Sequence, residues 1–341
     1  MKKLMKAIAL TAGIAMLGLT FTACDNTSSE SSSGSSGTSA DTVTIGVIQY
    51  TAHSSLDNCY EGFKEGLAEA GYVEGENLTL DFQNALGQTE TVDQLAKNMV
   101  SKDYDLVVGI ATPAATGAYA AAKGTDVPVV FCAVSDPVSV GLVESMDKSG
   151  NNCNGTSDLL NLEAQLKLIR ALQPDAKKIG ILYTTSEANS VSHLEKIKEL
   201  APEYGFEIVE QGVQSAADIP QAAATLVGKV DCINNFTDNN VVDNLQTVLS
   251  QANSAGIPVY GSEIEQVKKG CLASESLDYV ALGKQTAQVA DQILKGEDPA
   301  EMAVTTVEDS YPVINSDVAA QFNITIPEEY QDVELVTTSA E

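Results

Sequence analysis

From residue 43 onward, short apolar runs alternate along the chain with amphipathic segments whose apolar residues recur at helical spacing. The short runs are rich in β-branched residues, as is typical of strands buried on both faces. In the first half, the pattern predicts strands at 43–48, 78–83, 106–110 and 128–133 and helices at 56–70, 91–100 and 113–122. This alternation predicts a parallel sheet covered by helices on both faces.

After a polar stretch at 148–158 the same alternation starts again. It predicts helices at 160–172, 189–200, 219–226 and 240–255, with strands at 178–183, 206–212, 230–234, 258–260 and 271–273. A long helix at 279–294 and an apolar stretch at 311–314 complete the pattern. Two α/β units of similar size predict two doubly wound, parallel-sheet lobes facing each other across a cleft. We expect the first lobe in 42–155 and the second in 156–277.

The N-terminus is typical of an export signal. Three lysines precede an apolar run at 7–19, and a small residue precedes Cys24. The apolar run is too short for a permanent membrane span. Residues 1–23 match a bacterial lipoprotein signal, except that Phe21 replaces the usual leucine, and 24–41 form a Ser- and Gly-rich tether. We therefore expect Cys24 to carry a lipid anchor on the extracytoplasmic face of the cell membrane. The alternative is an ordinary cleavage site with an accidental cysteine.

Composition narrows the function further. The formal charge is −28, and removal of the three lysines in the signal makes it about −31, so nucleic acid is a poor partner. Without Cys24, an odd number of scattered cysteines remains, which predicts free thiols. The chain has two histidines, no tryptophan and no sequence motif for a metal, nucleotide or catalytic serine. We expect a monomer that needs no cofactor or metal and is not an enzyme.

Polar side chains follow nearly every predicted strand. Because ligands of open α/β sheets bind beyond the carboxyl ends of the strands, these side chains are candidates for ligand binding. They are Gln49, Tyr50, Asn84, Thr112, Ser135 and Asp136 in the first lobe and Glu187, Asn189, Ser190, Asp238 and Asn239 in the second. Any one of them could instead cap the helix that follows it.

The candidates divide into two chemical groups. Hydroxyls at Thr112 and Ser135, together with helix N-termini, suit a ligand carboxylate. Carboxylates at Glu187 and Asp238 suit an ammonium group, with Asp238 the first choice. This combination predicts an α-amino acid, aromatic or large and apolar in its side chain, as the ligand.

The chain also resembles a known family through phrases that occur in order over most of its length. The phrases are Ile45-Gly46-Val47-Ile48-Gln49 with His53 and Leu56-Asp57, Gln83-Asn84-Ala85, Ala111-Thr112-Pro113-Ala114-Ala115, Val134-Ser135-Asp136-Pro137, Asn154-Gly155-Thr156-Ser157-Asp158, Tyr183-Thr184-Thr185-Ser186-Glu187-Ala188-Asn189-Ser190, Thr237-Asp238-Asn239 and Leu282-Gly283-Lys284-Gln285-Thr286. They resemble the ABC-transporter substrate-binding lipoproteins of the group that includes tryptophan and tyrosine binders. A departure is Ser54, where a proline commonly follows the histidine.

The resemblance implies a type I periplasmic-binding-protein fold whose two lobes are joined by a hinge that the chain crosses three times. Part of 278–305 would return to the first lobe and part of 306–335 to the second. It also implies closure of the lobes around a small ligand and delivery of that ligand to an ABC permease in the membrane.

Three other functions remain open at this stage. A sensor ectodomain or a sugar- or nucleoside-binding protein could use the same fold, although a sugar site normally includes a stacking tryptophan and the chain has none. An amino-acid racemase could use one cysteine from each lobe, with Cys132 opposite Cys232 or Cys271.

The lipid anchor can be tested directly. In the bacterial host, Cys24→Ala should move the protein from the membrane fraction to the soluble exported fraction, because the acylated thiol is lost. Immunoblots of the two fractions measure the shift. An identical distribution of wild type and variant would contradict the anchor.

Overall fold

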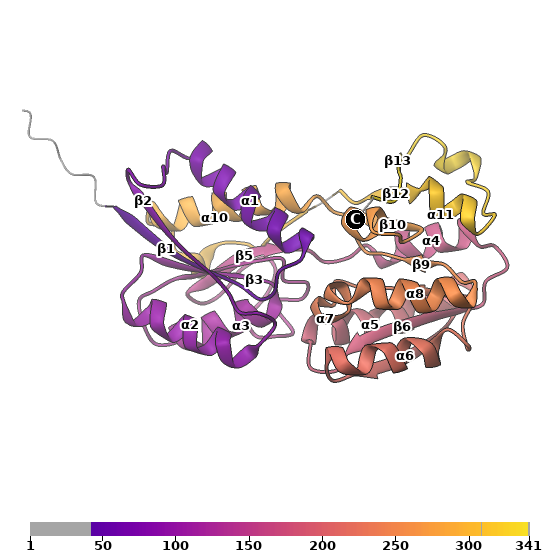
Figure 1. Cartoon of the computed structure of the whole chain (residues 1–341). Coiled ribbons are helices and arrows are strands. Elements are labelled where there is room, and N and C mark those ends of the chain that lie inside the picture. The colour runs from indigo at the N-terminus through magenta and orange to yellow at the C-terminus, as the bar shows by residue number, and fades with distance from the viewer. Residues whose placement is uncertain (1–41, 308, 340–341) are drawn as a thin grey trace, which may run out of the picture. The chain divides into compact units, whose positions relative to one another are not determined.

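A computed structural model describes residues 42–307 and 309–339, so the predicted signal, the tether and Cys24 lie outside the described residues. In the described part, the first lobe is built on one parallel sheet (Figure 1), in the order β11-β5-β4-β3-β1-β2. Its strands are β1 (Val43–Gln49), β2 (Leu78–Asn84), β3 (Leu106–Ile110), β4 (Val129–Cys132), β5 (Cys153–Ser157) and β11 (Thr305–Thr306).

Helices cover both faces of this sheet, as the sequence predicts. The helices are α1 (Ser54–Glu69), α2 (Thr89–Ser101), α3 (Thr112–Ala122) and α10 (Tyr279–Leu294). Val47 packs with α1 and α10, whereas its neighbour Ile48 packs with α2 and α3, because successive side chains of a strand point to opposite faces. Both residues are fully buried.

Glycines bring α1 and α10 together. A Cβ at Gly62 would overlap backbone atoms of Val280, and one at Gly283 would overlap backbone atoms of Cys59. The two helices therefore pack backbone to backbone, with the middle of α1 against the N-terminal part of α10. This contact holds a late segment of the chain against the first lobe.

The second lobe contains a four-stranded parallel sheet in the order β7-β6-β8-β9. Its strands are β6 (Lys178–Thr184), β7 (Glu207–Val213), β8 (Cys232–Asn234) and β9 (Val259–Tyr260). One face packs on α4 (Leu162–Leu172) and α5 (Ala188–Leu200). The other packs on α6 (Ile219–Leu226) and α8 (Leu245–Ala255).

A third, mixed sheet was not predicted from the hydropathy pattern. In it β10 (Ala273–Ser276) runs antiparallel to β12 (Tyr311–Asn315), which pairs in parallel with β13 (Glu334–Val336). The start of β10 is bonded to the chain that follows β9, since Gly261 N donates to Ala273 O at 2.9 Å. The smaller elements are α7 (Asn239–Asp243), α9 (Ile264–Lys268) and α11 (Ser316–Gln321), with 3-10 turns η1 (Ala201–Tyr204), η2 (Ala216–Asp218), η3 (Pro299–Glu301) and η4 (Glu328–Tyr330).

The polar stretch at 148–158 contains β5, which the hydropathy pattern missed. Its polar side chains are buried but paired: Asn154 Nδ2 donates to Met302 O at 2.9 Å, and the hydroxyls of Thr156 and Thr286 lie 2.7 Å apart. The first sheet consequently extends to Ser157, beyond the expected lobe boundary at 155, and pairs there with β11.

Two simpler features of the described residues bear on function. The five cysteines Cys59, Cys132, Cys153, Cys232 and Cys271 are free and buried, which confirms the prediction of unpaired thiols. Each helix within 42–307 and 309–339 is too short or too polar to cross a bilayer.

Asp238 organises the second lobe at the start of α7. Its Oδ1 accepts hydrogen bonds from Val241 N (2.9 Å) and Thr184 Oγ1 (2.8 Å). Its Oδ2 accepts from Thr184 N (2.6 Å) and Ser190 Oγ (2.7 Å). One buried carboxylate thus joins the end of β6 to α5 and α7. This is a structural role, and it uses both oxygens of the carboxylate that we expected to bind a ligand ammonium.

Asp238→Ala should lower the free energy of unfolding by about 2–4 kcal/mol, because it removes a helix cap and leaves the buried N–H of Thr184 without its acceptor. Denaturant titration measures the change. Asp243→Ala, at the exposed far end of the same helix, is the matched control and should stay within about 0.5 kcal/mol of wild type. Equal unfolding midpoints for all three proteins would contradict the role of Asp238.

Candidate functional site

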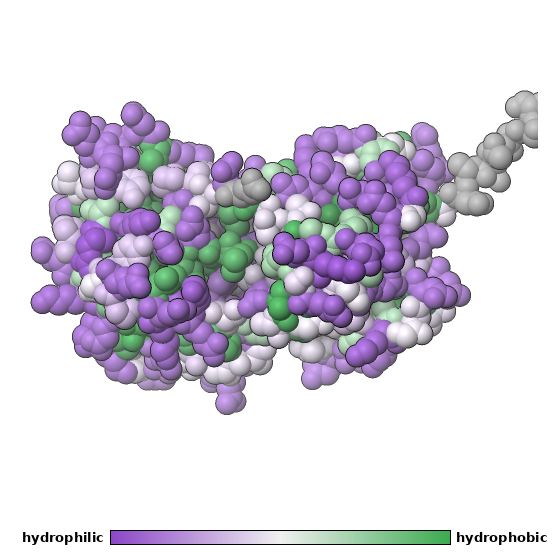
Figure 2. Space-filling model, turned by 180° about the vertical axis from the view of Figure 1, so that it is seen from behind, coloured by the Kyte–Doolittle hydropathy of each residue, from purple (hydrophilic) through white to green (hydrophobic). Residues whose placement is uncertain are grey.

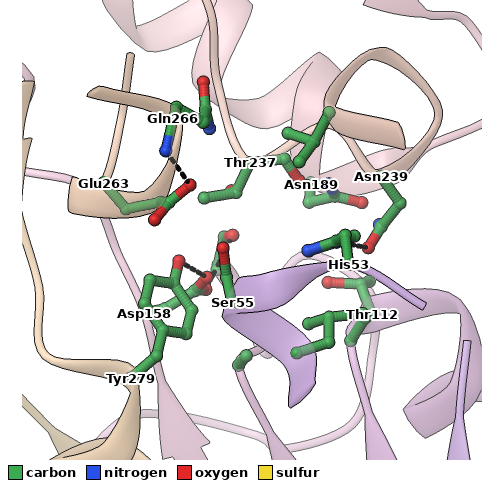
Figure 3. A pocket seen from close by; sticks show the side chains of 15 residues that line it. His53, Ser55, Thr112, Asp158, Asn189, Thr237, Asn239, Glu263, Gln266 and Tyr279 are labelled. Carbon is green, nitrogen blue, oxygen red and sulfur yellow. Dashed lines mark hydrogen bonds between the residues drawn. The ribbon is translucent and has the colours of Figure 1, made fainter. Parts of the chain in front are cut away.

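A pocket of about 330 Å³ lies between the two lobes, at the carboxyl ends of their strands (Figure 3). The first lobe and α10 contribute His53, Ser55, Leu56, Ala111, Thr112, Ala133, Ser135, Asp158 and Tyr279. The second lobe contributes Asn189, Thr237, Asn239, Val242, Glu263 and Gln266.

The first-lobe wall offers hydrogen-bond donors. The first main-chain bond of α1 is donated by Asp57 to His53 O, so the N–H groups of Ser55 and Leu56 are not used within the helix. Both residues line the pocket. The buried Thr112 hydroxyl, at the start of α3, has no hydrogen-bond partner among the described residues. Two helix N-termini and a hydroxyl therefore favour an anionic group here.

Two alanines of this wall have unusual backbone conformations. Ala111 follows β3 with φ of 78°, and Ala133 follows β4 with φ of 56°. Residues other than glycine rarely adopt positive φ because the Cβ then crowds the backbone. Both alanines line the pocket, so the strain is concentrated at the candidate site.

The second-lobe wall offers acceptors. The side-chain amide of Gln266 donates to Ser262 Oγ at 2.9 Å, and that of Asn189 donates to Thr237 O at 3.0 Å. These bonds use the amide nitrogens, and the buried oxygens Oε1 of Gln266 and Oδ1 of Asn189 have no partner in the described part of the chain. Ligand groups that face this wall must therefore be donors.

Two buried carboxylates stand on opposite sides of one end of the pocket. Glu263, from the second lobe, accepts hydrogen bonds from the main-chain nitrogens of Glu265 (2.6 Å) and Gln266 (2.9 Å). Asp158, after β5, accepts from the hydroxyls of Ser135 and Tyr279, each at 2.9 Å. Burial raises the pKa of Glu263 to about 7, and it also raises the pKa of Asp158. Both carboxylates would gain from a cationic partner.

Hydrogen bonds between described residues join the lobes directly. His53 Nε2 lies 3.4 Å from Asn239 Oδ1, and Ser192 Oγ donates to Asp136 Oδ2 at 2.8 Å. Burial lowers the pKa of His53 to about 4, so its ring is neutral near pH 7. A wider depression of about 1220 Å³ lies at the mouth of the cleft and shares Asn239 with the inner pocket. Seen from behind, hydrophilic residues cover most of the outer surface, and hydrophobic ones gather near the boundary between the lobes (Figure 2).

The structure brings four of the predicted site residues into the pocket: Thr112, Ser135, Asn189 and Asn239. Asp238 and Ser190 are instead bonded to each other inside the second lobe. Glu187 accepts hydrogen bonds from the main-chain nitrogens of Asn239 and Asn240, at 2.9 and 3.0 Å, so it caps α7 at the edge of the outer depression.

The remaining first-lobe candidates also have structural contacts outside the pocket. Gln49 is buried and donates to Asp57 Oδ1 at 2.7 Å, which fixes the first turn of α1. Tyr50 lines the outer depression and donates to Gly87 O at 2.8 Å. Asn84 accepts a hydrogen bond from Leu86 N in a turn. Asp136 accepts hydrogen bonds from Ser139 N in its own lobe and from the hydroxyl of Ser192 in the second lobe.

Sequence reasoning missed the two pocket acids. Glu263 follows the short strand β9, so the rule used for other strand ends would have found it. Asp158 follows β5, a strand that the pattern did not predict. Ser55, Gln266 and Tyr279 also line the pocket, and they lie in helices that gave no separate signal. Thr237 lines it too; it belongs to the phrase Thr237-Asp238-Asn239 but was not among the predicted site residues.

Comparisons with known proteins identify the family. The model of the family described as ABC transporter substrate binding protein matches residues 44–333. The chain is 39% identical over 273 residues to a tyrosine-binding protein of Clostridioides difficile (strain R20291), which covers 80% of this chain and 79% of that protein.

Solved structures share both the sequence and the fold. An ABC domain from Streptococcus pneumonia in complex with L-Trp is 37% identical, with a TM-score of 0.84 over 87% of this chain and all of that chain. A ligand-free, open substrate-binding protein with adhesive properties from Clostridium difficile is 36% identical, with a TM-score of 0.68 over 87% of this chain and all of that chain.

At nearly equal identity, the fold is closer to the structure that holds a ligand than to the open one. The two hydrogen bonds between the lobes agree with a closed arrangement. The two-lobed α/β architecture is that of the type I periplasmic binding proteins, as the sequence predicted. The chain belongs to the ABC transporter substrate-binding protein family.

Proposed function

We propose that this protein binds one α-amino acid with an aromatic side chain in the pocket between its lobes and delivers it to an ABC permease for import. Proteins of this family are extracytoplasmic, and the lipoprotein-like signal ending at Cys24 supports a lipid anchor at the outer face of the membrane. The observation that carries the proposal is the pocket's polarity: donors and helix N-termini on the first lobe oppose acceptors and a buried carboxylate on the second.

The carboxylate of the ligand belongs on the first-lobe wall. The unused N–H groups of Ser55 and Leu56 and the hydroxyl of Thr112 are all donors. Partial positive charge at the start of α1 and α3 adds electrostatic attraction. This agrees with the sequence-based expectation that Thr112 takes part in binding the carboxylate.

The ammonium group belongs between Glu263 and Asp158. Each carboxylate already accepts two hydrogen bonds and retains lone pairs, and Gln266 Oε1 adds a neutral acceptor beside Glu263. A cation at this point would offset the cost of burying two acids. Glu263 therefore replaces Asp238 as the proposed partner of the ammonium.

The rest of the pocket suits a flat, largely apolar side chain. Leu56, Ala111, Ala133 and Val242 line it, so apolar side chains face the ligand between the polar groups. The names of the relatives point the same way, since one is described as tyrosine-binding and another was solved with L-Trp.

The alternatives fit this pocket less well. A sugar offers neither a cation for Glu263 and Asp158 nor an anion for the helix N-termini, and the chain has no tryptophan to stack on a sugar ring. A two-cysteine racemase would need two thiols facing one ligand. Cys132 instead lies in the core of the first lobe, and Cys232 and Cys271 lie on opposite faces of the second-lobe sheet.

Calorimetry with the twenty amino acids tests the proposal, and Glu263→Gln tests the ammonium site. The variant should bind the best ligand about 10- to 100-fold more weakly, because a charge-assisted hydrogen bond is worth about 1.5–3 kcal/mol. Glu265→Gln, on the same short helix but paired with Lys268, is the matched control and should bind like wild type. Equal affinities in all three proteins would move the ammonium elsewhere.

Because the Glu263 carboxyl group titrates near neutral pH, we expect ligand affinity and the free energy of unfolding to change with pH in opposite directions. Ligand binding needs ionised Glu263, so affinity should fall about tenfold between roughly pH 8 and pH 6, around its pKa of about 7. The ligand-free fold should instead become more stable as the pH falls through that range, because the folded state binds a proton more readily than the unfolded one. Calorimetry and denaturant titration measure the two trends, and Glu263→Gln should flatten the dependence of affinity on pH.

A further inference from the structure

We propose that Ser135 and Tyr279 are positioning residues for ligand binding: their hydroxyls hold the carboxylate of Asp158 at the place where it meets the ammonium group of the ligand. This role rests on the proposed function, because it requires an amino acid whose ammonium group lies between Asp158 and Glu263. The two hydroxyls act through Asp158 rather than by bonding to the ligand themselves.

Asp158 lies in a segment that links the two lobes. It follows β5 and begins the stretch 158–161, which is neither helix nor strand and leads to α4 of the second lobe. Its neighbour Leu159 is 56% exposed, whereas Asp158 is only 2% exposed. The carboxylate is therefore turned inward from a linker that has no helical or sheet bonds of its own, so its position depends on groups from other parts of the chain.

Two hydroxyls from distant segments fix this carboxylate. Ser135, in the loop after β4, donates to Asp158 Oδ1, and Tyr279, the first residue of α10, donates to Asp158 Oδ2, each at 2.9 Å. Figure 3 shows the Tyr279 hydroxyl directed at Asp158. A hydroxyl has a single proton, so neither residue has a donor left for the ligand. Each carboxylate oxygen keeps a lone pair, so Asp158 can still accept a hydrogen bond from an ammonium group.

Glu263, the other acid of the pocket, is held in a different way. Its carboxylate caps α9 and accepts hydrogen bonds from the main-chain nitrogens of Glu265 and Gln266, in the first turn of that helix. A cap of this kind forms together with its own helix and needs no side chain from elsewhere. Removal of a distant hydroxyl should therefore disturb Asp158 and leave Glu263 in place.

The hydroxyls also favour the ionised form of this acid. Burial raises the pKa of Asp158, and the hydrogen bonds from Tyr279 and Ser135 act in the opposite direction. Without one of these donors, more of the carboxyl group is protonated, and the group can turn away from the ligand. Either change weakens a charge-assisted hydrogen bond to an ammonium group. A neutral hydroxyl at the same place on the ligand loses little, because it can pair with a carboxylic acid as well as with a carboxylate.

Calorimetry of the full chain with amino acids and their 2-hydroxy acid analogues tests this role. The pairs are L-tyrosine with L-4-hydroxyphenyllactate and L-tryptophan with L-indole-3-lactate, which differ only in the ammonium group. Tyr279→Phe and Ser135→Ala should each weaken the amino acids about tenfold and leave the hydroxy acids within about twofold of wild type. The matched control is Tyr260→Phe, which should bind all four compounds like wild type, because Tyr260 is equally buried and its hydroxyl has no partner in the described part of the chain. Thermal melts check that each variant is folded.

The outcomes separate this role from the proposed function. If the folded wild type binds neither amino acid, the proposed function is wrong, and the positioning role falls with it. If the wild type binds an amino acid but the variants weaken it and its hydroxy acid equally, or weaken neither, the proposed function stands and the positioning role is wrong. Ser135 and Tyr279 belong to different elements, so one folded variant of the two is enough to decide.

Discussion

The close packing of α1 against α10 is the contact on which the candidate site depends. Gly62 and Gly283 let the two backbones touch, and a side chain at either position would push the helices apart. The contact joins the middle of α1 to the N-terminal part of α10. The first turns of the two helices bring Ser55 and Leu56 of α1 and Tyr279 of α10 to the pocket. The contact thereby positions both the helix N-terminus that we assign to the ligand carboxylate and the hydroxyl that holds Asp158.

Four buried carboxylates near the cleft serve two different purposes. Asp238 and Glu187 stabilise the start of α7, and their oxygens are bonded to main-chain and side-chain donors of the second lobe. Glu263 and Asp158 face the pocket and accept fewer hydrogen bonds, whereas burial raises the pKa of all four carboxylates. Because an unpaired buried charge is costly, the second pair is the one that a cationic ligand would stabilise.

Within the described residues, the two lobes meet through few direct hydrogen bonds, which suits the opening and closing that we propose. The bond between His53 and Asn239 joins two neutral groups. The bond between Ser192 and Asp136 joins a hydroxyl to a carboxylate. Such bonds are worth about 1 kcal/mol each, so they favour closure only slightly on their own. A ligand that contacts Thr112 on one lobe and Glu263 on the other would stabilise the closed arrangement relative to the open one more than these bonds do.

The sequence by itself determined the α/β class, the two lobes, the family and part of the first-lobe wall. Hydropathy patterns of period 2 and period 3.6 reflect burial within single strands and helices, so these elements can be predicted from sequence. Ligands bind beyond the carboxyl ends of parallel strands, so the pocket residues Thr112, Ser135, Asn189 and Asn239 could be found in advance. Only the tertiary structure decided which acids line the pocket. Asp238 and Glu263 both follow strands, but whether a carboxylate is bonded within its own lobe or faces the other lobe depends on contacts between distant segments. The strand β5 was hidden for the same reason, since its polar side chains are buried only because Thr286 and Met302, far along the chain, pair with them.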